Sequence, residues 1–202
     1  DSSFAAHLPV TLASALMLFV TFKLHQILIH KQEAIFSVLI LSTTYLWFNF
    51  AHLATQDIIF SLLVNIGVFS FIKLDKNKNP LHLFLFGAWI GLAFMMKTFF
   101  VFIPIFAILP FLFFKKEILL NKSFWIGLLI GFVPFILWSI SIDQYIDKNI
   151  FIYLFDKLNQ LSSKNTFTNP FYYYFWNIPI NFVPWSLFAL VGLISNYKKI
   201  KK

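Results

Sequence analysis

LHLFLFGAWIGLAFMMKTFFVFIPIFAILPFLFF, residues Leu81–Phe114, is the stretch that decides the fold, because its 34 residues hold a single formal charge, Lys97. About 20 helical residues span the hydrocarbon core of a bilayer. One helix of this length would reach about 51 Å, which is far more than one crossing needs. The stretch is therefore predicted to cross the membrane twice and to turn at Lys97–Thr98.

The composition of the whole chain agrees with a membrane location. Hydrophobic residues make up 59% of the chain and charged residues only 12%, whereas a soluble domain carries about 25% charged residues. The sequence predicts an all-α, polytopic integral membrane protein with about seven transmembrane helices in a single domain, 1–202. The seven apolar runs are Leu8–Ile29, Ala34–Ala51, Ile58–Ile72, Leu81–Met96, Thr98–Phe114, Phe124–Ile142 and Phe175–Ile194.

The basic residues are all lysines, and they lie between the apolar runs instead of in one patch, which argues against a nucleic-acid partner. Alternating seven spans puts twelve lysines on one side and four on the other, and such an excess marks the cytoplasmic side. The twelve are Lys23, Lys31, Lys73, Lys76, Lys78, Lys115, Lys116, Lys122, Lys198, Lys199, Lys201 and Lys202, and the four are Lys97, Lys148, Lys157 and Lys164. The Lys97 turn, the His52–Asp57 loop and an outer loop of about residues 143–173 are thus predicted to face outward.

The outer loop has two parts of interest. Ile150, Leu154, Leu158 and Leu161 recur at helical spacing, which predicts an amphipathic helix on the membrane surface. Asn169–Phe188, NPFYYYFWNIPINFVPWSLF, follows and predicts re-entry into the bilayer, since aromatic rings with polar tips gather where a span meets water.

Charged groups beside membrane spans are functional candidates because they are costly to place there. Asp57 opens the third apolar run. In one interpretation it is a first-turn acid that complements the helix dipole, with Thr55 as the N-cap. In the other it binds a substrate hydroxyl or orients a basic partner, and His52, five residues earlier, is that partner or a metal ligand.

Lys97 and three tyrosines offer similar alternatives. Lys97 is either a lysine that extends its ammonium to the interface or a fixed cation for a phosphate group. Tyr172, Tyr173 and Tyr174 form an interfacial aromatic belt, and their hydroxyl groups are also suited to bind a phosphate or a sugar hydroxyl. The chain has no cysteine, so disulfides and thiolate sites are excluded.

Four segments together resemble one family of enzymes. FAAHLPVTLASAL (Phe4–Leu16) resembles "ARLPSAL", FAHLATQDIIF (Phe50–Phe60) resembles "FARxATxDxxL", and IGLAFMMKTFFVFIP (Ile90–Pro104) resembles "LGLAFLTKGPxxLLLP". Asn169–Phe188 resembles "PFYYYLPxLLLGxLPWSLF". These motifs occur in this order in the dolichyl-phosphate-mannose protein mannosyltransferase and aminoarabinose transferase superfamily, which has the GT-C fold.

The resemblance implies a glycosyltransferase (hexosyl or pentosyl) of the bacterial inner membrane that works on the outer face. It implies that the enzyme, embedded in membrane lipid, transfers a sugar with inversion from a polyprenyl-phosphate-linked donor to a lipid or protein acceptor. Asp57 matches a supporting carboxylate of the family, and Lys97 matches the lysine of "LTKG". Tyr172, Tyr173 and Tyr174 match the aromatic segment near the donor. The family's main acidic motif precedes "RLPSAL", so the resemblance implies an internal fragment that is inactive alone, with its principal base upstream of residue 1.

Three positions depart from the family pattern. His7 and His52, which the resemblance places at the substrate, stand where the family has arginine, and a titrating imidazole is a poorer phosphate clamp than a guanidinium. Thr98 stands where the family often has glycine. A cofactor, including a divalent metal, is left open, and so are two other function classes: a multi-pass transporter or lipid flippase without transfer chemistry, and a scaffold subunit of a membrane complex.

Overall fold

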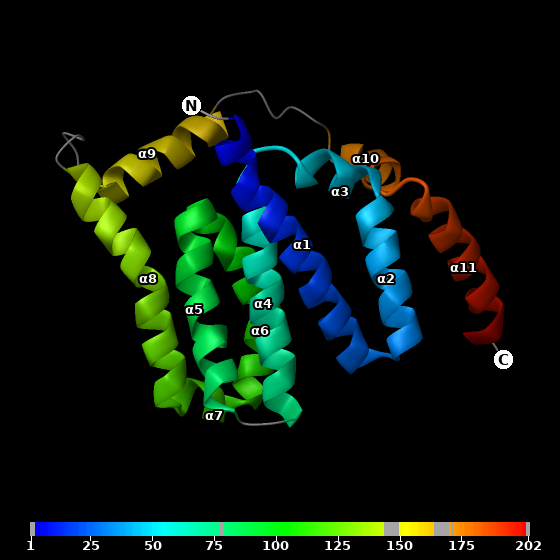
Figure 1. The fold of residues 1–202 in the computed structure, drawn as a ribbon, viewed down its shortest axis with the longest axis horizontal. Coiled ribbons are helices and arrows are strands. Elements are labelled where there is room, and N and C mark those ends of the chain that lie inside the picture. The colour runs from blue at the N-terminus through cyan, green and yellow to red at the C-terminus, as the bar shows by residue number, and fades with distance from the viewer. Residues whose placement is uncertain (1–2, 77–78, 144–149, 164–169, 171, 201–202) are drawn as a thin grey trace. The chain divides into compact units, whose positions relative to one another are not determined.

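The computed structural model describes residues 3–76, 79–143, 150–163, 170 and 172–200, and these residues form helices and no strands (Figure 1). The helices are α1 (Ser3–Leu28), α2 (Lys31–Thr43), α3 (Tyr45–Ala51), α4 (Asp57–Lys76), α5 (Pro80–Lys97), the 3-10 turn η1 (Thr98–Val101), α6 (Phe102–Phe114), α7 (Lys116–Leu120), α8 (Lys122–Asp143), α9 (Ile150–Ser163), α10 (Tyr173–Asn181) and α11 (Trp185–Ile200). The all-α prediction is confirmed.

The chain divides into two compact units, each described by itself. Residues Asp1–Ile58 and Phe167–Lys202 form the first, which we call the terminal unit, and Ile59–Thr166 form the central unit. The terminal unit holds α1, α2, α3, α10 and α11, and the central unit holds most of α4 and all of α5 to α9. The single domain over 1–202 stays a prediction.

Apolar helices of membrane-spanning length confirm the polytopic membrane class. Within the described residues, four stretches are long and apolar enough to cross a bilayer: Phe4–Leu28, Asp57–Leu74, Pro80–Phe114 and Lys122–Ile142. Two bent pairs raise the number to six if each pair is one span. These are α2 with α3, bent by 66°, and α10 with α11, bent by 107°.

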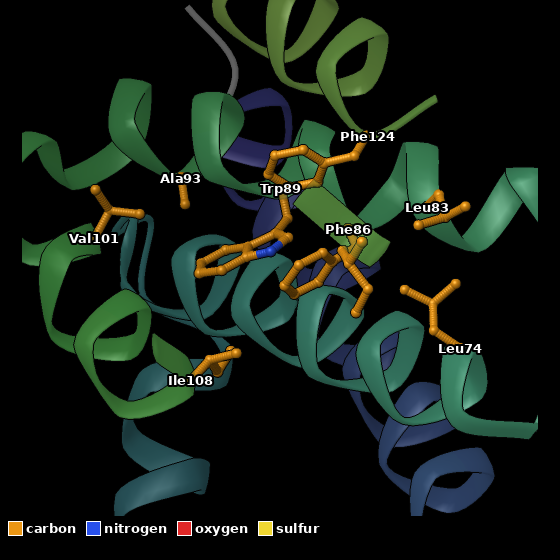
Figure 2. Close-up of a cluster of buried hydrophobic side chains, with 9 residues drawn as sticks. Leu74, Leu83, Phe86, Trp89, Ala93, Val101, Ile108 and Phe124 are labelled. Carbon is orange, nitrogen blue, oxygen red and sulfur yellow. The ribbon is translucent and has the colours of Figure 1, made fainter. Parts of the chain in front are cut away.

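Pro80–Phe114 counts once in that total, although it folds back on itself as its length predicts. Trp89 of α5 and Ile108 of α6 belong to one buried cluster (Figure 2), whereas a straight helix would separate them by about 28 Å. Leu83 and Phe114 line one cavity of about 280 Å³, and a straight helix would hold them about 46 Å apart. The turn is η1, directly after Lys97, so the predicted hairpin is confirmed.

Four glycines bring α5 and α8 into backbone contact in the central unit. A Cβ atom on Gly87 or Gly91 would meet the backbone of α8, and one on Gly127 or Gly131 would meet the backbone of α5. Gly87 faces Phe124 and Gly91 faces Gly131, so the two helices run parallel. Small residues spaced by four are a common way for membrane helices to approach closely. This contact is the structural centre of the unit.

The aromatic core lies on the other faces of α5. Trp89 is 2% exposed, and a Cβ on Gly67 of α4 would lie 2.6 Å from its ring. Phe86 packs beside it (Figure 2), and its ring lies 5.3 Å from that of Phe71 and 5.8 Å from that of Phe124, measured between centroids. Most other large apolar side chains point outward, as expected where lipid replaces water around a span.

The predicted amphipathic helix is present as α9, Ile150–Ser163, and its place on the membrane surface stays a prediction. Ile150 is buried, and the Phe155 ring lies 5.2 Å from the Phe99 ring of η1. This contact places α9 at the same end of the central unit as Lys97. Residues 144–149 and 164–169 of the outer loop, and the side chain of Leu161, lie outside the described residues.

Lysines gather at the opposite end of the central unit. Lys115 lines the cavity that Leu74 and Leu83 share, so the end of α4, the start of α5 and the end of α6 meet there. Lys97 lies at the far end of the 18-residue helix α5. This segregation agrees with the predicted orientation, which remains a prediction.

Candidate functional site

His7 supports the backbone at His52 in the terminal unit. Its Nδ1 atom lies 2.6 Å from the carbonyl oxygen of His52. A carbonyl oxygen only accepts, so Nδ1 carries the proton and donates this hydrogen bond. When the ring is neutral, Nε2 is therefore the acceptor. His7 and His52 are brought together, but through the backbone of His52 and not through both rings.

Ser14 makes a second link two turns further along the same face of α1. Its hydroxyl lies 2.9 Å from the Val10 carbonyl oxygen and 3.2 Å from that of Ala51. The last carbonyls of a helix have no partner within it. His7 and Ser14 thus supply donors at the C-terminal end of α3, where the chain turns toward Asp57.

The hydrogen bond of His7 can be tested by substitution. We expect His7→Ala to lower the free energy of unfolding by about 1 kcal/mol, since it leaves a carbonyl unpaired. His7→Asn keeps an amide donor near the position of Nδ1 and should recover at least half of that loss, whereas His7→Gln places the donor one carbon further out. Equilibrium unfolding in mixed micelles measures the difference, and equal losses in all three variants would contradict the assignment.

Asp57 is the first residue of α4 and is half-buried. Thr55 is not its N-cap, because the Thr55 hydroxyl is buried without a hydrogen-bond partner. The local turn is instead closed by the Thr55 N–H, which donates to the Leu53 carbonyl at 2.7 Å. The carboxylate at the first position still complements the helix dipole, so both interpretations of Asp57 stay open.

The ring of His52 packs against Phe48, with centroids 5.5 Å apart. Its predicted partnership with Asp57 stays a prediction. Across the described ranges, His, Asp and Glu residues do not gather in groups of three or more that could hold a metal ion.

Lys97 is half-buried at the last position of α5, in the central unit. Its ammonium group lies 5.8 Å from the centroid of the Phe60 ring and 5.9 Å from that of Phe100. Aromatic faces attract a cation at this range, and the negative end of the helix dipole does so as well. The two rings and the helix end thus hold the ammonium at the turn.

Thr98, directly after Lys97, has a positive φ of 43°. A β-branched residue is strained there, whereas glycine is not. The structure thereby gives a physical reason for the glycine that the family pattern has at this position. The sequence shows the departure from glycine at Thr98, but the positive φ appears only in the structure.

Thr98→Gly is accordingly expected to raise the free energy of unfolding by about 1 kcal/mol, since relief of the strain exceeds the added entropy of glycine in the unfolded chain. Thr98→Ala keeps the Cβ atom and should give less than half of that gain. The two variants can be compared by thermal unfolding in one detergent. A loss of stability in Thr98→Gly would show that Thr98 is not strained.

Tyr172, Tyr173 and Tyr174 lie at the start of α10 in the terminal unit. Tyr172 and Tyr174 are exposed, and the rings of Tyr173 and Tyr174 meet edge to face at 5.7 Å. The Tyr173 N–H donates to the Pro170 carbonyl oxygen at 2.8 Å, which fixes the first turn. Of the quoted re-entry stretch, Asn169 and Phe171 lie outside the described residues.

An apolar groove begins at these tyrosines. A first cavity of about 400 Å³ is lined by Tyr174, Phe175, Ile178 and Pro179. A second, of about 670 Å³, shares Ile178 and Pro179 with it and is lined further by Ile40, Phe182, Trp185, Ser186, Phe188, Ala189, Leu190 and Leu193. The two cavities share Ile178 and Pro179, and Ile40 of α2 also lines the second; we call the pair the trough.

Residues at two helix breaks were not predicted as part of the site. The runs Ala34–Ala51 and Phe175–Ile194 each read as one span, but the first breaks at Thr44 and the second between Asn181 and Trp185. Trp185 Nε1 donates to Thr43 Oγ1 at 2.8 Å, and the Tyr45 N–H donates to the Val183 carbonyl oxygen at 3.2 Å. The sequence around each break does not indicate which residues of the other span it bonds to.

Comparison with known proteins gives one match. The family model described as dolichyl-phosphate-mannose-protein mannosyltransferase matches residues 1–140. No curated protein and no solved structure matches the chain. The match includes His7, His52, Asp57 and Lys97 and ends before the tyrosines. Since it covers more than half of the sequence, this chain belongs to the dolichyl-phosphate-mannose-protein mannosyltransferase family.

Proposed function

We propose that the protein transfers a sugar from a polyprenyl-phosphate-linked donor to a lipid or protein hydroxyl on the outer face of the bacterial inner membrane. The observation that carries the proposal is the family match over the residues that hold Asp57 and Lys97. The helices of membrane-spanning length and the membership in a glycosyltransferase family do not depend on this proposal. The donor, the acceptor and the orientation are the proposed part.

The proposed reaction is a single displacement with inversion. A general base takes the proton of the acceptor hydroxyl, and its oxygen forms a bond to the anomeric carbon while the bond from that carbon to the phosphate oxygen breaks. Polyprenyl phosphate leaves with the electron pair. In this reaction Asp57 is the supporting carboxylate that binds the acceptor or orients its partner.

Lys97 of the central unit and the tyrosines of the terminal unit, each taken within its own unit, are the proposed candidates for charge stabilisation of the leaving phosphate. An ammonium group whose surroundings are two phenyl rings and a helix end is already ordered before the phosphate arrives, and ordered cations are the effective kind in catalysis. The exposed hydroxyl groups of Tyr172 and Tyr174 are available donors.

The trough that begins at Tyr174 is the proposed site of the donor's isoprenoid chain. Its lining is almost wholly apolar, and its two cavities share lining residues between Tyr174 and α11. A chain laid there would have its phosphate end at the tyrosines. The arrangement supports a lipid-linked donor over a water-soluble nucleotide sugar.

The broken spans favour a second class, a transporter or lipid flippase, because discontinuous helices often bind the substrates of transporters. One experiment separates the two classes. The intact protein is placed in sealed vesicles with a polyprenyl-phosphate donor carrying a labelled sugar, and both transfer to acceptor and movement of the donor across the bilayer are measured. We expect label on the acceptor and free polyprenyl phosphate in equal amounts. Donor movement without transfer would replace our proposal with the second class.

A further inference from the structure

The two broken spans of the terminal unit are joined to each other at their breaks. Trp185, the first residue of α11, bonds through its indole N–H to the hydroxyl of Thr43, the last residue of α2. Tyr45, the first residue of α3, bonds through its backbone N–H to the carbonyl of Val183. Both bonds lie within the terminal unit, and Figure 1 shows α3 and α10 near one another. We call these two hydrogen bonds the joint.

The joint satisfies backbone groups that the breaks release. In a continuous helix the Tyr45 N–H would bond to the Leu41 carbonyl, but Thr44 takes that carbonyl with both its N–H, at 3.2 Å, and its hydroxyl, at 2.8 Å. Thr44, at the break itself, is buried and only 2% exposed. An unpaired backbone group in apolar surroundings is expensive. The Val183 carbonyl supplies the partner.

Thr43 is arranged to receive the indole. Its hydroxyl donates to the Leu39 carbonyl at 2.6 Å, which directs a lone pair away from its own helix. Trp185 donates to that lone pair at 2.8 Å. The hydroxyl therefore acts as donor and acceptor at once, and only serine among the other residues of similar size offers both.

The joint stands between two parts of the proposed site. From Tyr45 the chain runs through α3 to His52 and Asp57, and from Val183 it runs back through α10 to Tyr173. The far end of α3 is fixed by His7 and Ser14 of α1. A seven-residue helix pinned at both ends moves little, so the joint sets the separation between the tyrosines and the His52–Asp57 loop.

We propose that Trp185 and Thr43 are positioning residues for sugar transfer, acting through the placement of α3 and α10. This inference rests on the proposed function. A displaced loop or tyrosine changes the alignment of the reacting groups more than it changes how well the long donor chain binds. Loss of the bond between Trp185 and Thr43 therefore lowers kcat and leaves KM for the donor nearly unchanged.

The test compares Trp185→Phe, Thr43→Val and the double variant in the intact enzyme. Phenylalanine keeps an aromatic ring in the trough and removes only the N–H, and valine keeps the volume of threonine. Each single variant should lower kcat about 10-fold, with KM for the donor within about twofold. The double variant should fall no further than the single ones, because both remove the same bond. Thr43→Ser should retain wild-type kcat.

Trp125→Phe is the matched control. The Trp125 indole also donates to a single oxygen, the Leu119 carbonyl at 2.7 Å, but in the central unit, at the start of α8. The Trp125→Phe variant should have the kcat of the wild-type enzyme. Multiplied losses in the double variant, or an equal loss in Trp125→Phe, would overturn the inference, as would unchanged kcat in Trp185→Phe. If the wild-type enzyme transfers no sugar, the proposed function fails instead, so the two failures are distinguishable.

Discussion

Replacing Asp57 with asparagine is expected to lower kcat/KM for sugar transfer about 100-fold, as the loss of a group that takes part in proton transfer or its orientation does. Asparagine has the same shape and can bind the first turn of a helix. The loss of the charge at the start of α4 should change the free energy of unfolding by less than about 1 kcal/mol. A large loss of activity with little change in the free energy of unfolding would therefore report on the role of Asp57 in the reaction.

The measurement is transfer from a polyprenyl-phosphate donor by the intact enzyme, with unfolding followed on the same samples. Asp156→Asn on α9 is the matched control, since Asp156 is a half-buried carboxylate with no assigned role in the reaction. It should retain wild-type turnover. If Asp57→Asn turns over at the wild-type rate, Asp57 serves only the helix dipole, and the supporting carboxylate has to be sought elsewhere.

Leucine at Gly91 is expected to prevent stable packing of the central unit, with a loss of about 3 kcal/mol or more in the free energy of unfolding. The first atom of any side chain there would meet the backbone at Gly131 and Phe132, which cannot rotate away. Even Gly91→Ala should destabilise by about 1 kcal/mol. The measurement is unfolding by denaturing detergent in mixed micelles.

At Gly192 of α11, substitution of glycine by alanine is expected to have the opposite effect on stability from the one at Gly91. Nothing lies within 4 Å of a Cβ atom built there. Gly192→Ala should raise the helix stability by up to about 1 kcal/mol, because alanine is the better helix former. A loss at Gly91 and a gain at Gly192 from the same substitution would show that contact with α8, and not helix propensity, is being measured. Equal effects at both positions would contradict the glycine contact.

Length and composition predict much of the fold. The hairpin in Leu81–Phe114 follows from comparing the length of the run with the thickness of a bilayer, and the structure confirms that the run folds back on itself. The spacing of Gly87 with Gly91 and of Gly127 with Gly131 is also readable in the sequence as a helix contact, although it does not say that α5 and α8 are the partners. Pairing is a property of tertiary structure.

The candidate site is less predictable because its key contacts are not local. Lys97 stands out as a lone charge, but the two rings around it come from α4 and η1. Thr44 breaks a span without a proline or glycine beside it, because Tyr45 has a partner at Val183. His7 matches a position for phosphate binding in the family pattern, and in the structure its ring donates to a backbone carbonyl.

The joint between Thr43 and Trp185 also bears on how the protein is assembled during synthesis. The two residues are 142 positions apart. Thr43 is therefore synthesised before the central unit, and Trp185 is synthesised after it. Chains fold from the N-terminus as they emerge, and the contacts within α5 to α8 close much shorter loops. The central unit can therefore be complete while the Tyr45 N–H still lacks its partner. The bond between Thr43 and Trp185 is then among the last to form, because α11 is made after the central unit.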